Sequence, residues 1–118
     1  MGLQVLIVDD NKNICTLLED ILSLDNHTSA VANDGKAAKA ALENGKYDVV
    51  FCDLTLPDIS GWDIVQHIKD NTPETEVVII SGMGDSIDQE KLSEHNIDNV
   101  IHKPFQITDV QSVLADLQ

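Results

Sequence analysis

Five short runs rich in apolar and branched residues recur along the chain, and they constrain its fold more than any other feature. The runs occupy residues 3–8, 28–32, 48–52, 76–80 and 97–101, and the run at 28–32 has the weakest pattern. Runs of this kind are typical of strands buried on both faces, as in a parallel sheet. Because amphipathic segments separate the runs, we predict an α/β fold with helices on both faces of a five-stranded parallel sheet.

Apolar residues at helical spacing predict a helix after each strand. Short polar side chains cap helix starts, so Asn11 or Asp10 can begin the first helix, and Ser60 the third. Asn44-Gly45 ends the second helix with residues that tolerate the left-handed conformation. We expect the helices over residues 14–22, over 37–43, from Ser60 to Thr72-Pro73, from Asp85 or Ser86 to Asn96, and over 107–117. The fourth helix would carry Ile87 and Leu92 and follow a flexible loop at 81–84.

Charged and polar side chains follow four of the predicted strands. Asp9-Asp10 follow the first strand, Asp53 the third, Ser81 the fourth and Lys103 the fifth. The carboxyl ends of parallel strands lie at one edge of a sheet, where open α/β folds bind ligands. We therefore expect three carboxylates, a hydroxyl and an ammonium to meet there, although a lone Asp at a strand end often only starts a loop.

This set of groups suits phosphoryl transfer. Clustered carboxylates repel one another, and Mg²⁺, which prefers oxygen ligands, relieves that repulsion. An Asp carboxylate is a competent nucleophile, Lys103 supplies a point charge for a phosphoryl group, and Ser81 can donate a hydrogen bond to it. A metal would also neutralise charge on the transferring group. The sequence thus predicts an Mg²⁺-assisted phosphoryl acceptor.

The same residues give the chain a resemblance to a known family, the receiver domains of two-component response regulators. The matching segments are Val8-Asp9-Asp10-Asn11, Asp53-Leu54-Thr55-Leu56-Pro57, Gly61, Ser81-Gly82 and Lys103-Pro104-Phe105. The resemblance spans essentially the whole chain. It implies one receiver domain over residues 1–118, with the flavodoxin-like (βα)5 fold and the strand order 2-1-3-4-5.

The resemblance also implies a role for each matching residue. Asp53 would be the phosphoacceptor, phosphorylated by a sensor histidine kinase or a phosphotransfer histidine. The implied Mg²⁺ ligands are Asp10, Asp53 and the backbone carbonyl of Thr55, with Asp9 assisting through water. The phosphoryl group would be contacted by Ser81, Lys103 and the backbone amides of Thr55 and Gly82. Phosphorylation would then change binding to a downstream protein or a fused output domain.

Two positions depart from the family pattern. Receivers often carry Tyr or Phe three residues before the lysine, where this chain has Val100, which cannot swing a ring between buried and exposed states. Asn96 stands where Gly is frequent. Val100 motivates an alternative function, a receiver-like interaction module that does not switch. A flavin-binding electron carrier is a poorer alternative, because the loops lack aromatic residues to stack on a flavin. No nucleotide-binding motif occurs, so we expect no ATP or NAD.

The charged composition of the chain limits the classes of partner that it can bind. The formal net charge is −14, with 21 acidic residues against seven lysines and no arginine. Such a chain is repelled by nucleic acid and by anionic membrane surfaces, and it has no apolar run long enough to span a bilayer. We expect a cytoplasmic protein, monomeric as this chain, with Cys15 and Cys52 as reduced, buried thiols. The four histidines show no metal-ligand spacing, and we interpret them as non-catalytic.

Overall fold

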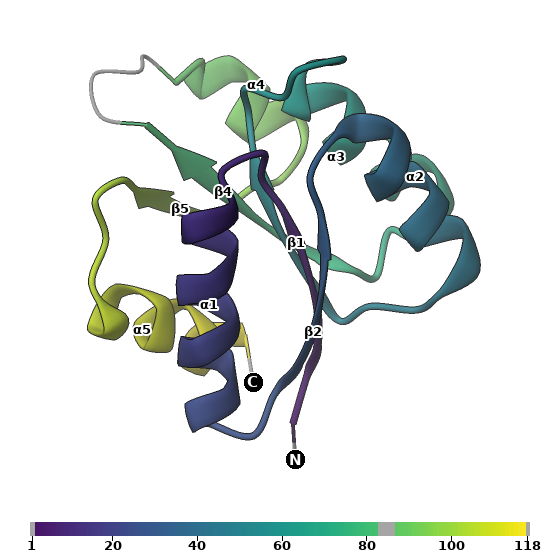
Figure 1. The fold of residues 1–118 in the computed structure, drawn as a ribbon. Helices are drawn as coiled ribbons and strands as arrows, with labels where there is room; N and C mark the ends of the chain where they lie inside the picture. The colour runs from purple at the N-terminus through teal and green to yellow at the C-terminus, as the bar shows by residue number, and fades with distance from the viewer. Residues whose placement is uncertain (1, 83–86, 118) are drawn as a thin grey trace.

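The computed structural model describes residues 2–82 and 87–117. Its centre is an all-parallel sheet in which the strands lie in the order second, first, third, fourth, fifth, as the resemblance to receiver domains implied (Figure 1). The strands are β1 (Gln4–Val8), β2 (Thr28–Ala32), β3 (Val49–Asp53), β4 (Glu76–Ser81) and β5 (Asn99–His102). The chain therefore reverses its winding direction between β1 and β3, and ligands of open α/β sheets bind at such a point.

Five helices alternate with these strands and form the two outer layers. They are α1 (Lys12–Leu24), α2 (Gly35–Asn44), α3 (Gly61–Asn71), α4 (Gln89–Glu94) and α5 (Ile107–Leu117). Figure 1 shows α1 and α5 on one face of the sheet and α2, α3 and α4 on the other. None of the helices in the described part of the chain combines the length and apolar character that crossing a membrane requires.

The core consists of two clusters, one on each face of the sheet. Alternation along the strands sends neighbouring side chains to opposite faces. In β3, Phe51 packs in the cluster under α1 and α5, whereas Cys52 packs in the cluster under α2 and α3. Both side chains are fully buried, as are Ile7 and Val8 in β1. Burial on both faces explains why these strands read as continuous apolar runs.

The helix caps decide between Asn11 and Asp10 and test the other caps that the sequence predicts. Asn11, rather than Asp10, caps α1, because its Oδ1 accepts hydrogen bonds from the amides of Asn13 and Ile14 at 3.0 and 3.2 Å. Ser60 caps α3 as expected. Asn96 adopts the left-handed conformation with φ 56°, whereas Gly45 after α2 is extended with φ −147°. The tolerance of Gly45 for the left-handed region is therefore not used.

The fourth predicted helix is wrong at its start. Asp85, Ser86 and the last two residues of the predicted loop at 81–84 lie outside the described residues, but Ile87 is described and precedes the helix. The carboxylate of Asp88 accepts hydrogen bonds from the amides of Glu90 and Lys91, so it begins α4 at Gln89. The fifth strand also begins later than predicted, at Asn99, although Ile97 is buried.

Candidate functional site

Three carboxylates meet at the carboxyl edge of the sheet. Asp9 and Asp10 follow β1, Asp53 is the last residue of the neighbouring β3, and one carboxylate oxygen from each lies within 4.8 Å of the others. Asp9 is completely buried, Asp53 is 6% exposed and Asp10 is exposed. Within the described residues, no other set of three or more acidic, histidine or cysteine side chains gathers this closely.

Lys103 brings a positive charge into this cluster from the end of β5. Its Nζ lies 2.9 Å from Oδ2 of Asp9 and 3.2 Å from Oδ2 of Asp53. Oδ2 of Asp9 is buried, and among the described residues this ion pair is its polar contact. Oδ1 of Asp9 instead accepts a hydrogen bond from the amide of Asn11 at 2.9 Å. One ammonium is thus shared between two buried carboxylates.

The electrostatics of the cluster leave negative charge uncompensated. Burial raises the pKa of Asp9, and the charge of Asp53 adds to that rise, while contacts with Lys103 and the amide of Asn11 oppose it without cancelling it. Burial alone lowers the pKa of Lys103, but the hydrogen bond and charge of Asp9, together with Asp53, raise it overall. Lys103 therefore stays an ammonium, and three carboxylates face one positive charge.

The loop after β3 directs a backbone amide at Asp53. The amide of Thr55 donates to Oδ1 of Asp53 at 3.0 Å, while the Thr55 side chain is exposed. The loop closes on itself because the amide of Gly61 donates to the carbonyl of Leu54 at 2.8 Å. A Cβ at Gly61 would lie 2.2 Å from the backbone oxygen of Asp53, so only glycine allows this approach. Gly61 thereby brings the loop up against the end of β3.

Ser81 is the last residue of β4, and Gly82 follows it. Ser81 is 1% exposed, and its carbonyl accepts a hydrogen bond from the amide of Lys103 at 2.7 Å. Its hydroxyl donates to the carbonyl of Gly82 at 3.4 Å. The structure thus joins the ends of β4 and β5. Ser81 is linked to Asp53 through Lys103, and Gly82 is placed next to Ser81.

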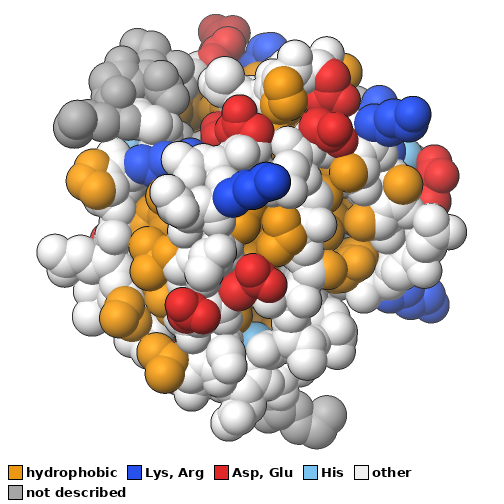
Figure 2. Space-filling view, in the orientation of Figure 1, with side chains coloured by type: hydrophobic (Ala, Val, Ile, Leu, Met, Phe, Trp, Pro, Cys, Tyr) orange, Lys and Arg blue, Asp and Glu red, His pale blue; other side chains and the backbone are white. Residues whose placement is uncertain are grey.

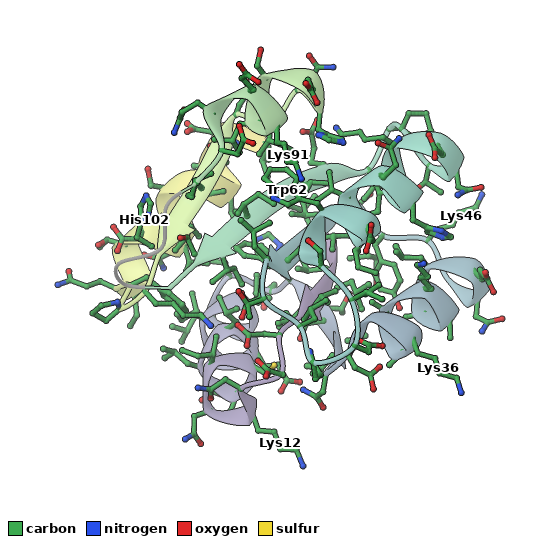
Figure 3. The ribbon with its side chains drawn as sticks, turned by 90° about the horizontal axis from the view of Figure 1, so that it is seen from above. Lys12, Lys36, Lys46, Trp62, Lys91 and His102 are labelled. Atoms are coloured by element: carbon green, nitrogen blue, oxygen red, sulfur yellow. The ribbon has the colours of Figure 1, made fainter. Side chains whose placement is uncertain are left out.

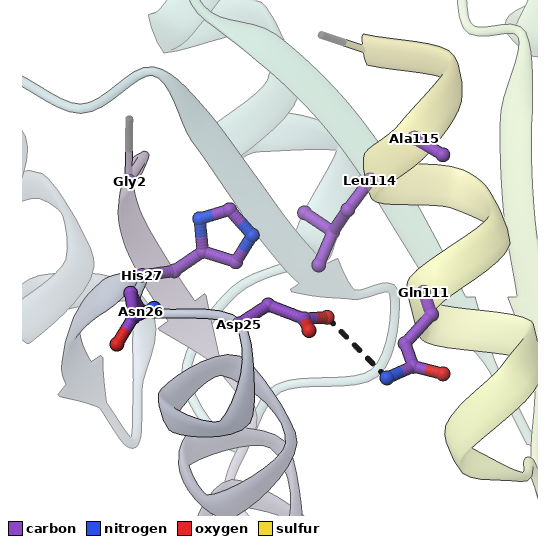
Figure 4. A pocket seen from close by; sticks show the side chains of 7 residues that line it. All are labelled: Gly2, Asp25, Asn26, His27, Gln111, Leu114 and Ala115. Carbon is purple, nitrogen blue, oxygen red and sulfur yellow. Dashed lines mark hydrogen bonds between the residues drawn. The ribbon is translucent and has the colours of Figure 1, made fainter.

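Other chemistry-bearing side chains lie elsewhere. His102, the last residue of β5, is exposed, and Figure 3 shows it at the edge of the molecule. A cavity of about 390 Å³ lies at the opposite end of the sheet, between the turn after α1 and helix α5 (Figure 4). Its lining includes His27, whose Nδ1 accepts from the Leu3 amide, and Asp25, which accepts from Gln111. None of the predicted site residues lines it.

One contact at the site has no counterpart in the sequence-based prediction. Nδ2 of Asn33, in the loop after β2, donates to the backbone carbonyl of Asp9 at 2.9 Å. The sequence places Asn33 in an Asn-Asp-Gly segment, which reads only as punctuation between a strand and a helix. Because a side chain reaching a backbone atom 24 residues away leaves no periodic pattern, sequence reasoning missed it.

Comparisons with known proteins agree with this geometry. A family model described as the response regulator receiver domain matches residues 5–115. The response regulator ArlR of Staphylococcus epidermidis is 32% identical over 114 residues, which cover 97% of this chain and 50% of that protein. The transcriptional regulatory protein TcrA of Mycobacterium tuberculosis is 28% identical over 116 residues, covering 98% of this chain and 46% of that protein. The chain thus spans about half the length of these curated relatives.

Solved structures show the same fold. The response regulator TrrA of Thermotoga maritima, solved in complex with Mg(2+)-BeF, is 25% identical with a TM-score of 0.86, and the match covers both chains completely. NtrX of Brucella abortus is 30% identical with a TM-score of 0.86, over 99% of this chain and 27% of that one. The chemotaxis protein CheY4 of Vibrio cholerae has a TM-score of 0.89 at 20% identity, with complete coverage of both chains, and so shares the fold. From its sequence, sheet order and strand-end residues, this chain belongs to the response regulator receiver domain family of two-component systems.

Proposed function

We propose that this chain is a phosphorylation-switched signalling module in which Asp53 accepts a phosphoryl group. The observation that carries the proposal is the contact of Lys103 with Asp53 at 3.2 Å, inside a cluster of three carboxylates whose oxygens lie within 4.8 Å. A structural ion pair would need one carboxylate. Three carboxylates around one ammonium are costly for folding alone, and such arrangements concentrate at functional sites.

In the proposed reaction, a carboxylate oxygen of Asp53 attacks the phosphorus of a phosphohistidine or a small acyl phosphate. A new P–O bond to Asp53 forms as the bond from phosphorus to the donor nitrogen or oxygen breaks, and the donor leaves with that electron pair. Lys103 then pairs with phosphoryl oxygens instead of the free carboxylate, and Ser81 and the amides of Thr55 and Gly82 donate hydrogen bonds to them. Slow attack by water would return Asp53 and phosphate. The domain acts on itself in this scheme, not as a turnover enzyme.

The residues present fit Mg²⁺. The cluster offers only oxygen ligands, one of its carboxylates is exposed, and burial beside Asp53 raises the pKa of Asp9, so a cation there would stabilise its carboxylate. We assign the ligands as before to Asp10, Asp53 and the Thr55 carbonyl, with Asp9 acting through water. When bound, Mg²⁺ would neutralise charge on the phosphoryl group during transfer.

The proposed partners follow from the family and the charge. A sensor histidine kinase or a phosphotransfer protein would supply the phosphoryl group in the cytoplasm, and a downstream protein or fused output domain would read it. On the face drawn in Figure 2, lysine side chains lie apart with acidic side chains among them. Together with the net charge of −14, this supports a domain that does not itself bind nucleic acid or a membrane surface.

Phosphorylation can be tested on the isolated chain. The protein is incubated with Mg²⁺ and acetyl phosphate, and intact mass spectrometry measures the fraction that gains one phosphoryl group. Wild-type protein is expected to gain it only with Mg²⁺, and Asp53→Asn is expected to gain none. A wild-type protein that gains no phosphoryl group, or an equal gain in Asp53→Asn, contradicts the proposal.

The alternative of a non-switching interaction module is favoured by one position. Val100 in β5 is partly buried and packs against the cluster under α2 and α3, so no aromatic ring is available there to change place. Amide exchange with and without Mg²⁺ and beryllofluoride separates the two functions. Slowed exchange around Ser81 and β5 supports switching, whereas an unchanged pattern despite phosphorylation of Asp53 supports the alternative.

A further inference from the structure

We propose that Asn33 is a positioning residue that fixes the backbone position of Asp10 and thereby the Mg²⁺ affinity of the site. Its Nδ2 donates to the backbone carbonyl of Asp9 at 2.9 Å. The thiol of Cys15 donates to the same carbonyl at 3.4 Å, and Nδ2 of Asn33 also lies 3.7 Å from that sulfur. The Asp9 carbonyl thus accepts hydrogen bonds from two side chains. The inference about Mg²⁺ affinity rests on the proposed function, whereas the inference about the backbone of Asp9 does not.

The contact continues the sheet beyond the last backbone pair. The register of β1 and β2 ends at Val8 and Ala32, and the Asp9 amide still donates to the Ala32 carbonyl at 3.1 Å. The chain then turns into the loop before α2, so the Asn33 side chain supplies the next donor. As a result, both the amide and the carbonyl of Asp9 are hydrogen-bonded to the segment that ends β2.

This carbonyl controls Asp10 because a peptide unit is planar. Fixing the oxygen of Asp9 fixes the peptide plane that carries the nitrogen and Cα of Asp10, and so the point from which the Asp10 side chain reaches the cluster. The Asp10 carboxylate is exposed, and no hydrogen bond or ion pair to it occurs among the described residues. Its position in the cluster therefore depends on the backbone, while repulsion from Asp9 and Asp53 pushes it away.

Mg²⁺ makes this dependence measurable, because it demands near-ideal octahedral geometry. A loop that relaxes would spread the carboxylates before the ion binds, and the ion would have to draw them together again. A purely structural role for Asn33 would lower stability and leave the affinity of the folded protein unchanged. The two roles therefore differ in a binding measurement made well below the unfolding temperature.

The test compares Asn33→Leu with Asn44→Leu, a matched control. Asn44 is an exposed residue of α2, and its Nδ2 also donates to a backbone carbonyl, that of Ala40, at 2.9 Å. Mg²⁺ affinity is measured by calorimetric titration. We expect Asn33→Leu to weaken Mg²⁺ binding about tenfold, the factor equivalent to about 1.4 kcal/mol, and Asn44→Leu to bind as the wild type does. Asn33→Ser, whose hydroxyl is too short to reach the carbonyl, replaces Asn33→Leu if that variant fails to fold.

A second measurement uses the metal-free proteins, so that it stands even if the wild type binds no Mg²⁺. The amide of Asn11 donates to Oδ1 of Asp9, so it reports on the backbone between Asp9 and Asn11. We expect faster hydrogen exchange and a shifted resonance for Asn11 in Asn33→Leu, but not in Asn44→Leu. An Asn11 amide that is unchanged in Asn33→Leu overturns the inference. If the wild type binds Mg²⁺, equal Mg²⁺ affinity of Asn33→Leu and the wild type also overturns it. Absence of Mg²⁺ binding in the wild type with a changed Asn11 amide overturns only the proposed function.

Discussion

The imidazole of His95 stacks on the indole of Trp62, with ring centroids 5.4 Å apart and an interplanar angle of 29°. This contact joins α4 to α3, and Lys91 lies over the same indole, with Nζ 5.7 Å from its centroid (Figure 3). Nε2 of His95 also lies 3.0 Å from Oε1 of Gln66 in α3. α4 contains no fully buried residue, and these contacts add to the packing of its partly buried Leu92 against the cluster under α2 and α3.

Replacing His95 should therefore be visible in the fluorescence of Trp62, the single tryptophan. His95→Ala uncovers one face of the indole, so we expect a red-shifted emission maximum and easier quenching by iodide. His102→Ala is the control, because His102 is exposed on β5 and makes no contact with Trp62 among the described residues. Identical spectra for wild type and His95→Ala would show that this stacking does not persist in solution.

Gly61→Ala should destabilise the fold. The added Cβ would lie 2.2 Å from the carbonyl oxygen of Asp53 and 2.6 Å from Cα of Leu54, so backbone must move. Overpacking of this kind costs about 1–3 kcal/mol. Urea denaturation measures it, with Gly45→Ala as the control, because a Cβ there meets its nearest neighbours at 3.4 Å and the backbone is extended. Equal stability of the two variants would refute the steric argument for Gly61.

Asp9→Asn should stabilise the metal-free protein. Burial raises the pKa of Asp9, which means that its carboxylate form is disfavoured in the fold. Asparagine keeps an oxygen for the Asn11 amide, and Lys103 keeps Asp53 as a partner. We expect a higher unfolding temperature without Mg²⁺ and a smaller increase on adding it than in the wild type. A variant less stable than the wild type in the absence of metal would contradict the inference that the carboxylate cluster carries uncompensated negative charge.

The free energy of unfolding should fall in alkaline solution, because the buried Cys15 thiol resists ionisation in the folded chain. Burial, followed by the charges of Asp9 and Glu19, raises the pKa of Cys15 from 9.0 to about 11. Above pH 9 the unfolded chain loses this proton and the folded chain keeps it, so the stabilising difference is present below pH 9 and lost by about pH 11. A rise of this size corresponds to about 3 kcal/mol.

Urea denaturation of wild type and Cys15→Ala across this range isolates the thiol from other titrating groups. The stability advantage of the wild type over the variant should shrink from pH 9 to pH 11. A constant difference between the two proteins would mean that the Cys15 thiol ionises equally easily in the folded and unfolded chains.

The sheet and the charged residues at its edge could be predicted because each depends on local pattern or strand order. Apolar runs placed the strands, and the strand ends placed Asp9, Asp53 and Lys103 at one edge. The start of α4 and the contact of Asn33 could not be predicted in this way. Several neighbouring polar side chains could cap α4, so the sequence does not fix where that helix begins. The Asn33 side chain bonds to a backbone atom that is distant in sequence, and such a contact leaves no local pattern.

The central claim is that Asp53 itself carries the phosphoryl group, and reductive trapping tests it most directly. Borohydride reduces an aspartyl phosphate to homoserine, and peptide sequencing by mass spectrometry locates the converted residue. After incubation with Mg²⁺ and acetyl phosphate, we predict homoserine at Asp53 and at no other aspartate, and none when Mg²⁺ is omitted. Homoserine at Asp9 or Asp10, or no homoserine at all in protein that has gained a phosphoryl group, would contradict the account.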